Sequence, residues 1–198
     1  MSEPLRFMAP EEQARANFYG LLARLYYSAP DAAFLKALAM ADELDAEDET
    51  LAARWRELIA AAAATEADAV REEYDDAFVG TGKAPVTLYV CAYSIRYTNE
   101  TPLAELRADL ASLGLARREQ AGEPEDHIAA LCETMRHLIA QQQRPLEEQQ
   151  RFFERWMRPN YEALCSAIEA SERTSFYRHV AHMAKAFFSL EQAAFEML

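Results

Sequence analysis

The sequence predicts an all-α fold, with a single globular helical domain spanning residues 1–198. Three observations favour this fold. Apolar residues recur about every 3.6 positions, as on one face of a helix. The chain has only 5 Gly and 8 Pro but is rich in Ala, Leu and Glu, which favour helices. A length of 198 residues suits one domain. We expect about nine helices, in an N-terminal part over about 10–113 and a C-terminal part over about 124–198.

The first helix is expected to start at Pro10, because proline is favoured at the first helical position and Glu11 and Glu12 follow it. Pro30 and Asp31 then end this helix and start a second one. The apolar stripes of these two helices consist of Phe18, Leu21, Leu22, Leu25 and Tyr26, and of Phe34, Leu35, Leu38 and Ala41.

Two more helices are expected before residue 80. The acidic segment 45–50 is either a solvated connection or the opening of the third helix. The fourth helix begins near Thr65 or Glu66. The stripes of these helices consist of Leu51, Trp55, Leu58, Ile59 and Ala62, and of Val70, Tyr74, Ala77 and Phe78.

Two stretches break the helical pattern. The first is an irregular Gly/Pro loop near 80–90, because residues 80–85 hold two glycines and a proline. Residues 86–90 have the propensity of a strand, but no second strand is in view, so we expect extended or irregular chain. The second stretch is a polar link near 114–126, which Gly114 is placed to open by ending a helix.

The remaining helices follow similar signals. Thr101 and Pro102 supply a cap and a first helical residue, Pro145 opens a later helix, and Pro159 interrupts the chain before the next one. Their stripes consist of Leu103, Leu106, Leu110 and Leu113; Ile128, Leu131, Met135, Leu138 and Ile139; Phe152, Phe153 and Trp156; Tyr161, Leu164, Cys165 and Ile168; and Phe176, Tyr177, Val180, Met183, Ala184, Phe187 and Phe188.

Charge narrows the classes of partner. The chain carries 20 Lys and Arg against 33 Asp and Glu, a formal net charge of −13. Such a surface repels phosphate backbones and anionic lipids, so we expect no nucleic-acid partner and no stable membrane insertion. The same charge would attract a basic peptide.

The sequence also indicates a compartment. Residues 1–7 contain no apolar core of a signal peptide, and no apolar run approaches the roughly 20 residues of a membrane span. The three cysteines are odd in number and form no C-x-x-C pair, which argues against a secreted disulfide framework. We therefore expect a cytoplasmic protein.

Several classes of enzyme lack their motifs in this sequence. It contains no H-E-x-x-H, no G-x-x-x-x-G-K-[ST] and no G-x-S-x-G, and no histidine follows a glutamate by three positions. His179 and His182 could reach one metal ion from a helix face, but no carboxylate or cysteine stands at helical spacing to complete the site. Surface or interhelical histidines are the favoured interpretation, so we expect no metal site and no catalytic residue.

The segment 123–127 combines three acids with His127. An enzyme would use Asp126 and His127 as an acid/base pair, but adjacent residues on a helix point about 100° apart. Alternatively, Glu125 and Asp126 lie in the first turn of a helix, where the helix dipole favours negative charge. The residues alone favour this capping role.

The aromatic residues have two interpretations. Most of them fall at helical core spacing, and the simplest expectation is that they are buried. Some could instead line a groove for an apolar peptide.

Two motifs resemble those of a known family. Glu123-Pro124-Glu125-Asp126-His127 resembles the E-P-x-D-H signature of the TorD/DmsD/NarJ family of molybdoenzyme maturation chaperones. Tyr74-Asp75-Asp76-Ala77-Phe78-Val79-Gly80 is similar to its Y-x-x-L-F-x-G element. The order of aromatic residues in the C-terminal helices also resembles this family, so the resemblance covers roughly residues 15 to 190.

The resemblance implies a chaperone rather than an enzyme. It implies that the partner is an apo-molybdoenzyme and its twin-arginine signal peptide, that the chaperone aids cofactor insertion, and that it holds back export until the enzyme is mature. By motif position, it places Glu123, Pro124, Asp126 and His127 in the client-binding region. Tyr74 and Phe78 are weaker candidates that could simply be core residues. Asp126 could meet a client arginine or cap its own helix, and no cofactor of the chaperone itself is expected.

Two other classes of function stay open from the residues. One is a helical regulator that senses a small molecule, although no basic DNA-binding segment is evident. The other is a metal-dependent helical enzyme. The expected state is a monomer, or a dimer that exchanges halves across the link 114–126.

Overall fold

The computed structural model describes residues 8–44, 48–80, 84–94, 102–116 and 122–198. Within these residues it contains nine α-helices and no strand, which confirms the all-α prediction. Parts of four expected features lie outside the described residues: the acidic segment at 45–47, the loop at 81–83, the cap Thr101 and the link at 117–121.

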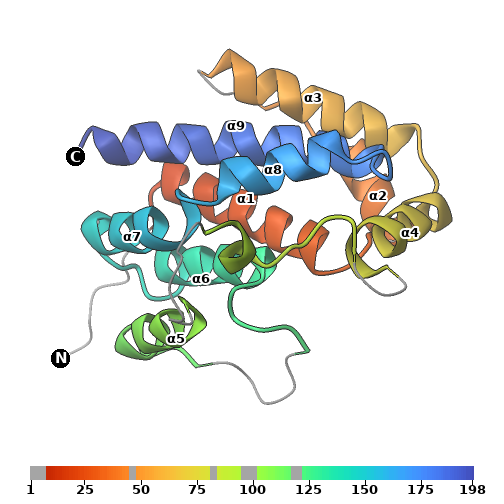
Figure 1. Ribbon diagram of the computed structural model, residues 1–198. Helices are drawn as coiled ribbons and strands as arrows, with labels where there is room; N and C mark the ends of the chain where they lie inside the picture. The colour runs from red at the N-terminus through yellow and green to blue at the C-terminus, as the bar shows by residue number, and fades with distance from the viewer. Residues whose placement is uncertain (1–7, 45–47, 81–83, 95–101, 117–121) are drawn as a thin grey trace.

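The helices follow the order of the expected apolar stripes (Figure 1). They are α1 (Pro10–Tyr27), α2 (Ala32–Ala39), α3 (Glu49–Ala63), α4 (Ala67–Tyr74), α5 (Pro102–Ser112), α6 (Ile128–Ala140), α7 (Leu146–Phe152), α8 (Tyr161–Ala170) and α9 (Phe176–Glu196). Three short segments are also helical: the π-helical turns η1 (Asp75–Val79) and η3 (Phe153–Met157), and the 3₁₀ turn η2 (Val90–Tyr93).

The helix ends show why the elements begin and stop where they do. Pro10 opens α1, as predicted. The Asp31 and Asp48 carboxylates accept hydrogen bonds from backbone N–H groups in the first turns of α2 and α3. Gly114 has a φ of +74°, and the N–H of Leu115 next to it donates to the Leu110 carbonyl at 2.8 Å. This left-handed turn ends the helical stretch that contains α5, as the sequence predicts.

The long helix α9 lies between α3 on one side and α1 on the other, while α8 packs along it (Figure 1). Helix α1 packs most extensively on α6. Helices of the N-terminal and C-terminal parts therefore share one core and do not form separate lobes.

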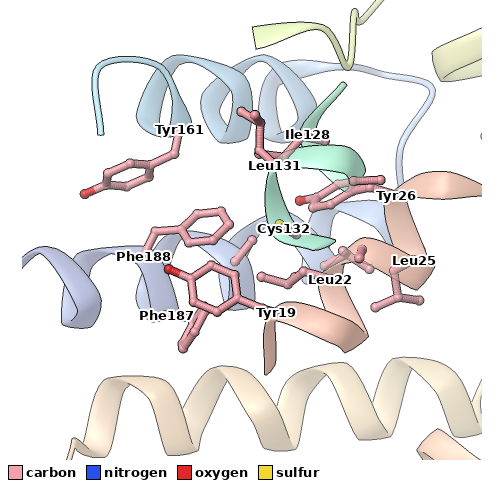
Figure 2. Close-up of a cluster of buried hydrophobic side chains, with 14 of the residues drawn as sticks. Tyr19, Leu22, Leu25, Tyr26, Ile128, Leu131, Cys132, Tyr161, Phe187 and Phe188 are labelled. Carbon is pink, nitrogen blue, oxygen red and sulfur yellow. The ribbon is translucent and has the colours of Figure 1, made fainter. Parts of the chain in front are cut away.

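The core lies where α1, α6, α8 and α9 meet (Figure 2). Tyr19 of α1 meets Phe187 of α9 edge to face with 4.9 Å between ring centroids, and Tyr161 of α8 meets Phe188 at 5.6 Å. Cys132 of α6 is fully buried in the same cluster. Most of the C-terminal aromatic residues are therefore core, in agreement with the simpler of the two expectations.

A buried ion pair also joins α1 to α9. The Arg15 guanidinium binds the Glu191 carboxylate at 2.6 Å, and the Tyr19 hydroxyl donates to the same carboxylate at 2.9 Å. Gln149 of α7 accepts a further hydrogen bond from Arg15 at 3.0 Å. Because Glu191 is only 3% exposed, these partners replace the water that its charge would otherwise need.

The two irregular stretches contact each other, which the sequence pattern does not indicate. Tyr89 and His127 form an isolated antiparallel bridge. The Val90 N–H donates to the Asp126 carbonyl, and the Ile128 N–H donates to the Leu88 carbonyl, both at 2.9 Å. Residues 86–90 are thus irregular, as expected, but they find a pairing partner in the link.

The expected capping role of Glu125 and Asp126 is wrong. Helix α6 begins at Ile128, so neither acid lies in its first turn. His127 is the N-cap, and its Nδ1 atom accepts from the Ala129 N–H at 3.2 Å. Residues 125 and 126 lie in a turn, His127 has an extended backbone that pairs with Tyr89, and the helix starts only after it.

Candidate functional site

The predicted site residues Glu123 and His127 line two cavities. The first, here called the Tyr74 cavity, has a volume of about 550 Å³ and is lined by Tyr74, Phe78, Val79, Ala84, Thr87, Leu88, Tyr89, Ala92, Glu123 and His127. The second, the Tyr27 cavity, has a volume of about 330 Å³ and is lined by Ala23, Arg24, Tyr27, Glu123, His127, Ala129, Ala130 and Glu133. Through Glu123 and His127, the link therefore joins the two cavities into one concave surface. The other parts of this surface are the end of α1, the start of α6, η1 and the loop before η2.

The role of His127 as N-cap fixes both the position of its ring and the nitrogen that carries the proton. Because its Nδ1 atom accepts a hydrogen bond from Ala129, a neutral imidazole carries its proton on Nε2. Burial lowers the pKa of His127, although the nearby carboxylates of Glu123 and Asp126 oppose this shift. At neutral pH the ring is therefore an uncharged donor that lines both cavities.

Glu123 is held by Tyr89. The Tyr89 hydroxyl donates to Glu123 Oε2, and this hydrogen bond is the main reason why the pKa of Tyr89 rises to about 12. Among the described residues, no donor occupies the Oε1 atom of Glu123. The carboxylate is thus oriented by a phenol and retains an oxygen that can accept from a cation.

Tyr74 and Phe78 form the aromatic wall of the Tyr74 cavity. Their rings meet edge to face at 5.2 Å, and Phe78 meets Tyr177 of α9 at 4.9 Å. The π-helical turn η1, which continues α4, places Phe78 beside Tyr74. The Tyr74 hydroxyl donates to the carbonyls of Tyr26 and Tyr27, both at 3.1 Å. The two residues therefore serve the packing of α4 on α1 and α9 and also line the cavity.

The α4 end of this wall is tied to α9 by a second carboxylate. Glu73 accepts hydrogen bonds from the backbone N–H groups of Ser175, Phe176 and Tyr177 at 2.7 to 3.0 Å. A negative side chain at a helix N-terminus satisfies donors that have no partner within the helix. This contact fixes the position of α4, and with it the aromatic wall.

Asp126 and Pro124 belong to the frame of the site and do not line either cavity. Asp126 is 7% exposed. Burial, together with the nearby Asp126 carboxylate, raises the pKa of the Cys91 thiol to about 12. The Pro124 carbonyl accepts from the His127 N–H at 3.2 Å. Glu125 binds Arg107 of α5 at 3.0 Å, which anchors the link to that helix.

Three lining residues were not chosen from the sequence. Tyr89 and Tyr27 are 36% and 56% exposed, and Glu133 adds a second carboxylate at the Tyr27 cavity. In a helical sequence pattern an exposed tyrosine cannot be distinguished from a buried one, so only the fold shows that Tyr27 lines a cavity. The position of Tyr89 follows from its bridge to His127, which no local signal predicts.

One cluster elsewhere has the chemistry of a metal site. Glu57 of α3 lies beside His179 and His182 of α9, with candidate ligand atoms within 4.8 Å of one another. The carboxylate that the histidine pair lacks at helical spacing is therefore supplied by another helix.

Comparison with known protein families gives a match over most of the chain. The sequence model of the family described as nitrate reductase delta subunit matches residues 41–189, more than half of the chain. The chain belongs to this family. Delta-subunit family members are chaperones for molybdoenzyme assembly, which confirms the chaperone part of the resemblance seen in the sequence. The match contains Tyr74, Phe78, Tyr89, Glu123 and His127, whereas Arg24 and Tyr27 precede it.

A comparison with curated proteins found no match. No described helix of this delta-subunit family member is both long enough and apolar enough to cross a membrane.

Proposed function

We propose that this delta-subunit family member is a cytoplasmic chaperone that binds the twin-arginine signal peptide, and through it the apo form, of a molybdenum-cofactor oxidoreductase. It aids cofactor insertion and holds back export until the enzyme is mature, without catalysing a reaction itself. The observation that carries the proposal is that Glu123 and His127 line two adjoining cavities whose other walls are largely apolar.

The chemistry of such a peptide matches this surface. Two arginines beside an apolar segment need carboxylates at the edge of an apolar groove. Glu123 and Glu133 supply the carboxylates, and Tyr27, Val79 and Tyr89 are apolar or aromatic side chains at least one-third exposed. The net charge of −13 would draw the cationic peptide toward the protein.

The residues have different proposed roles. Glu123 accepts from a client arginine through Oε1, while Tyr89 keeps its carboxylate in place through Oε2. His127 donates from Nε2 to a client carbonyl. Tyr74 and Phe78 contact the apolar segment, and Pro124 and Asp126 hold the link in register.

Among the described residues that line the Tyr27 cavity, Arg24 is the only cation, and its guanidinium has other partners. Its guanidinium donates to the Ser28 hydroxyl at 2.7 Å and lies 5.4 Å from the centroid of the Phe34 ring. The Glu123 carboxylate therefore faces a client with little competition from Arg24, whereas Glu133 pairs with Arg136 at 3.6 Å and would have to exchange this partner for a client arginine.

Calorimetric titration with a synthetic twin-arginine leader peptide tests the proposal. Binding should weaken about tenfold or more when both arginines are replaced by glutamine, since charge-assisted hydrogen bonds are lost. Equal affinity for both peptides, or no binding of either at low salt, would contradict the proposed function.

A further inference from the structure

Helices α3 and α9 lie side by side (Figure 1), and one polar cluster spans the contact between them. His179 and His182 stand three residues apart on α9, so their side chains project from the same face. Glu57 faces them from α3, and one candidate ligand atom of each residue lies within 4.8 Å of the other two. We propose that Glu57, His179 and His182 bind a divalent transition-metal ion, of which Zn²⁺ is the best match.

The donor set supports this class of metal. Two imidazoles and one carboxylate make a three-ligand zinc site, in which water or another ligand takes the fourth position. This set also suits Co²⁺ but not the hard ions Mg²⁺ and Ca²⁺, which prefer oxygen ligands throughout. Ligand atoms about 2.1 Å from one zinc ion lie roughly 3.4 Å apart, so the separations between the three ligand atoms need to shorten by about 1.4 Å at most. The Glu57 side chain is 42% exposed, so this movement requires the carboxylate to leave Arg54 but does not require the core to repack.

The histidine nitrogens provide a second observation. The Nδ1 atoms of His179 and His182 are both buried, and neither has a hydrogen-bond partner among the described residues. A buried polar atom without a partner is costly and uncommon. Coordination through Nδ1 would satisfy such an atom.

Glu169 of α8 supports His182 from the other side of the ring. Its carboxylate oxygen lies 3.9 Å from His182 Nε2. A metal-binding histidine usually donates its other ring N–H to an acceptor such as a carboxylate. Glu169 would take this part after a small approach, because 3.9 Å exceeds hydrogen-bond distance. Burial also lowers the pKa of His182, which favours the neutral ring that can bind a metal.

Two cations lie near the cluster and have defined effects. Arg54 pairs with Glu57 at 2.8 Å and would compete with the metal for this carboxylate. The Lys185 ammonium lies 3.9 Å from the Glu169 carboxylate. Its charge therefore acts on this neighbour of His182 and not directly on the three proposed ligands. Removal of the Arg54 charge should therefore strengthen metal binding.

The test is a titration of the metal-free full chain with Zn²⁺ by calorimetry, and with Co²⁺ by visible absorption, which reports the ligand geometry. We expect one equivalent per chain, at least a tenfold weaker affinity in Glu57→Gln and His182→Asn, and a tighter affinity in Arg54→Gln. Saturation at a hundred times Kd should raise the Tm by about 5–10 °C, since the ion binds only the folded state.

Two controls make the result decisive. His137→Asn on α6 removes a histidine outside the cluster, and Glu123→Gln removes a carboxylate of the client site; both should leave zinc affinity unchanged. Circular dichroism verifies that each variant is folded. Absence of stoichiometric binding, or equal affinity in the wild type and in folded Glu57→Gln and His182→Asn, would overturn the proposal without bearing on the client site.

Discussion

The ring of Tyr89 meets the imidazole of His127 edge to face with 5.4 Å between centroids, and the backbones of the same two residues form an antiparallel bridge. Through this relationship the loop before η2 and the link before α6 become one surface. Tyr89 then reaches Glu123, and His127 caps α6. The start of α6, the orientation of the Glu123 carboxylate and the shape of the two cavities therefore all depend on Tyr89 and His127.

The first prediction concerns pH. Burial lowers the pKa of His127 below its usual value of 6.5, so the unfolded chain takes up a proton more readily than the folded chain. The contribution of this group to stability is complete above pH 6.5 and is lost as the pH falls toward the folded-state pKa. In urea unfolding, the free energy of unfolding should decrease as the pH is lowered from 7 to 5. His127→Asn should make this pH dependence less steep, since asparagine caps a helix but does not titrate.

The burial of His182 lowers its pKa as well, so part of the slope should persist in His127→Asn. The variant His182→Asn provides the complementary measurement. If the free energy of unfolding depended on pH identically in the wild type and in the double variant His127→Asn with His182→Asn, neither ring would titrate as described.

The second prediction concerns Glu73. Its carboxylate accepts from three N–H groups at the start of α9, and Glu73→Ala should lower the free energy of unfolding by about 1–3 kcal/mol. Thermal unfolding should show a drop of roughly 2–4 °C for each kcal/mol. Glu72→Ala, at an exposed neighbouring position, is the matched control and should have little effect. Similar losses in both variants would mean that the contact to α9 adds no stability.

The third prediction concerns the ion pair of Arg15 and Glu191. Glu191→Ala leaves a largely buried guanidinium without its partner and should cost about 3–5 kcal/mol. The double replacement Arg15→Met with Glu191→Leu should recover much of this loss, because it removes both charges and keeps apolar volume. Urea unfolding of the single and double variants measures the difference, and a double variant as unstable as Glu191→Ala would refute this explanation.

Most of the fold could be predicted from the sequence because each helix carries its own signals. Pro10 and Asp31 mark helix starts locally, Gly114 marks an end, and the apolar stripes identify the buried faces. These signals depend on neighbours within one or two turns, and the structure confirms the elements they predict.

The parts that could not be predicted depend on contacts between distant segments. Glu125 and Asp126 have the composition of a helix start, but the bridge to Tyr89 delays α6 until Ile128. Tyr89 lies 38 positions before His127 in the chain, and Glu57 lies more than 120 positions before the histidines of α9. Helical periodicity carries no information about such neighbours.

The central claim is that Glu123 accepts a client arginine at the edge of the two cavities. Its most direct test is the affinity of a twin-arginine leader peptide, measured by calorimetry at low and high salt, for the wild type, Glu123→Gln and Glu147→Gln. Glu147 is exposed in the first turn of α7, so its replacement changes the net charge equally but leaves the site intact. We predict that Glu123→Gln weakens binding about tenfold at low salt and that Glu147→Gln has little effect. Equal affinity in the two folded variants would contradict the account.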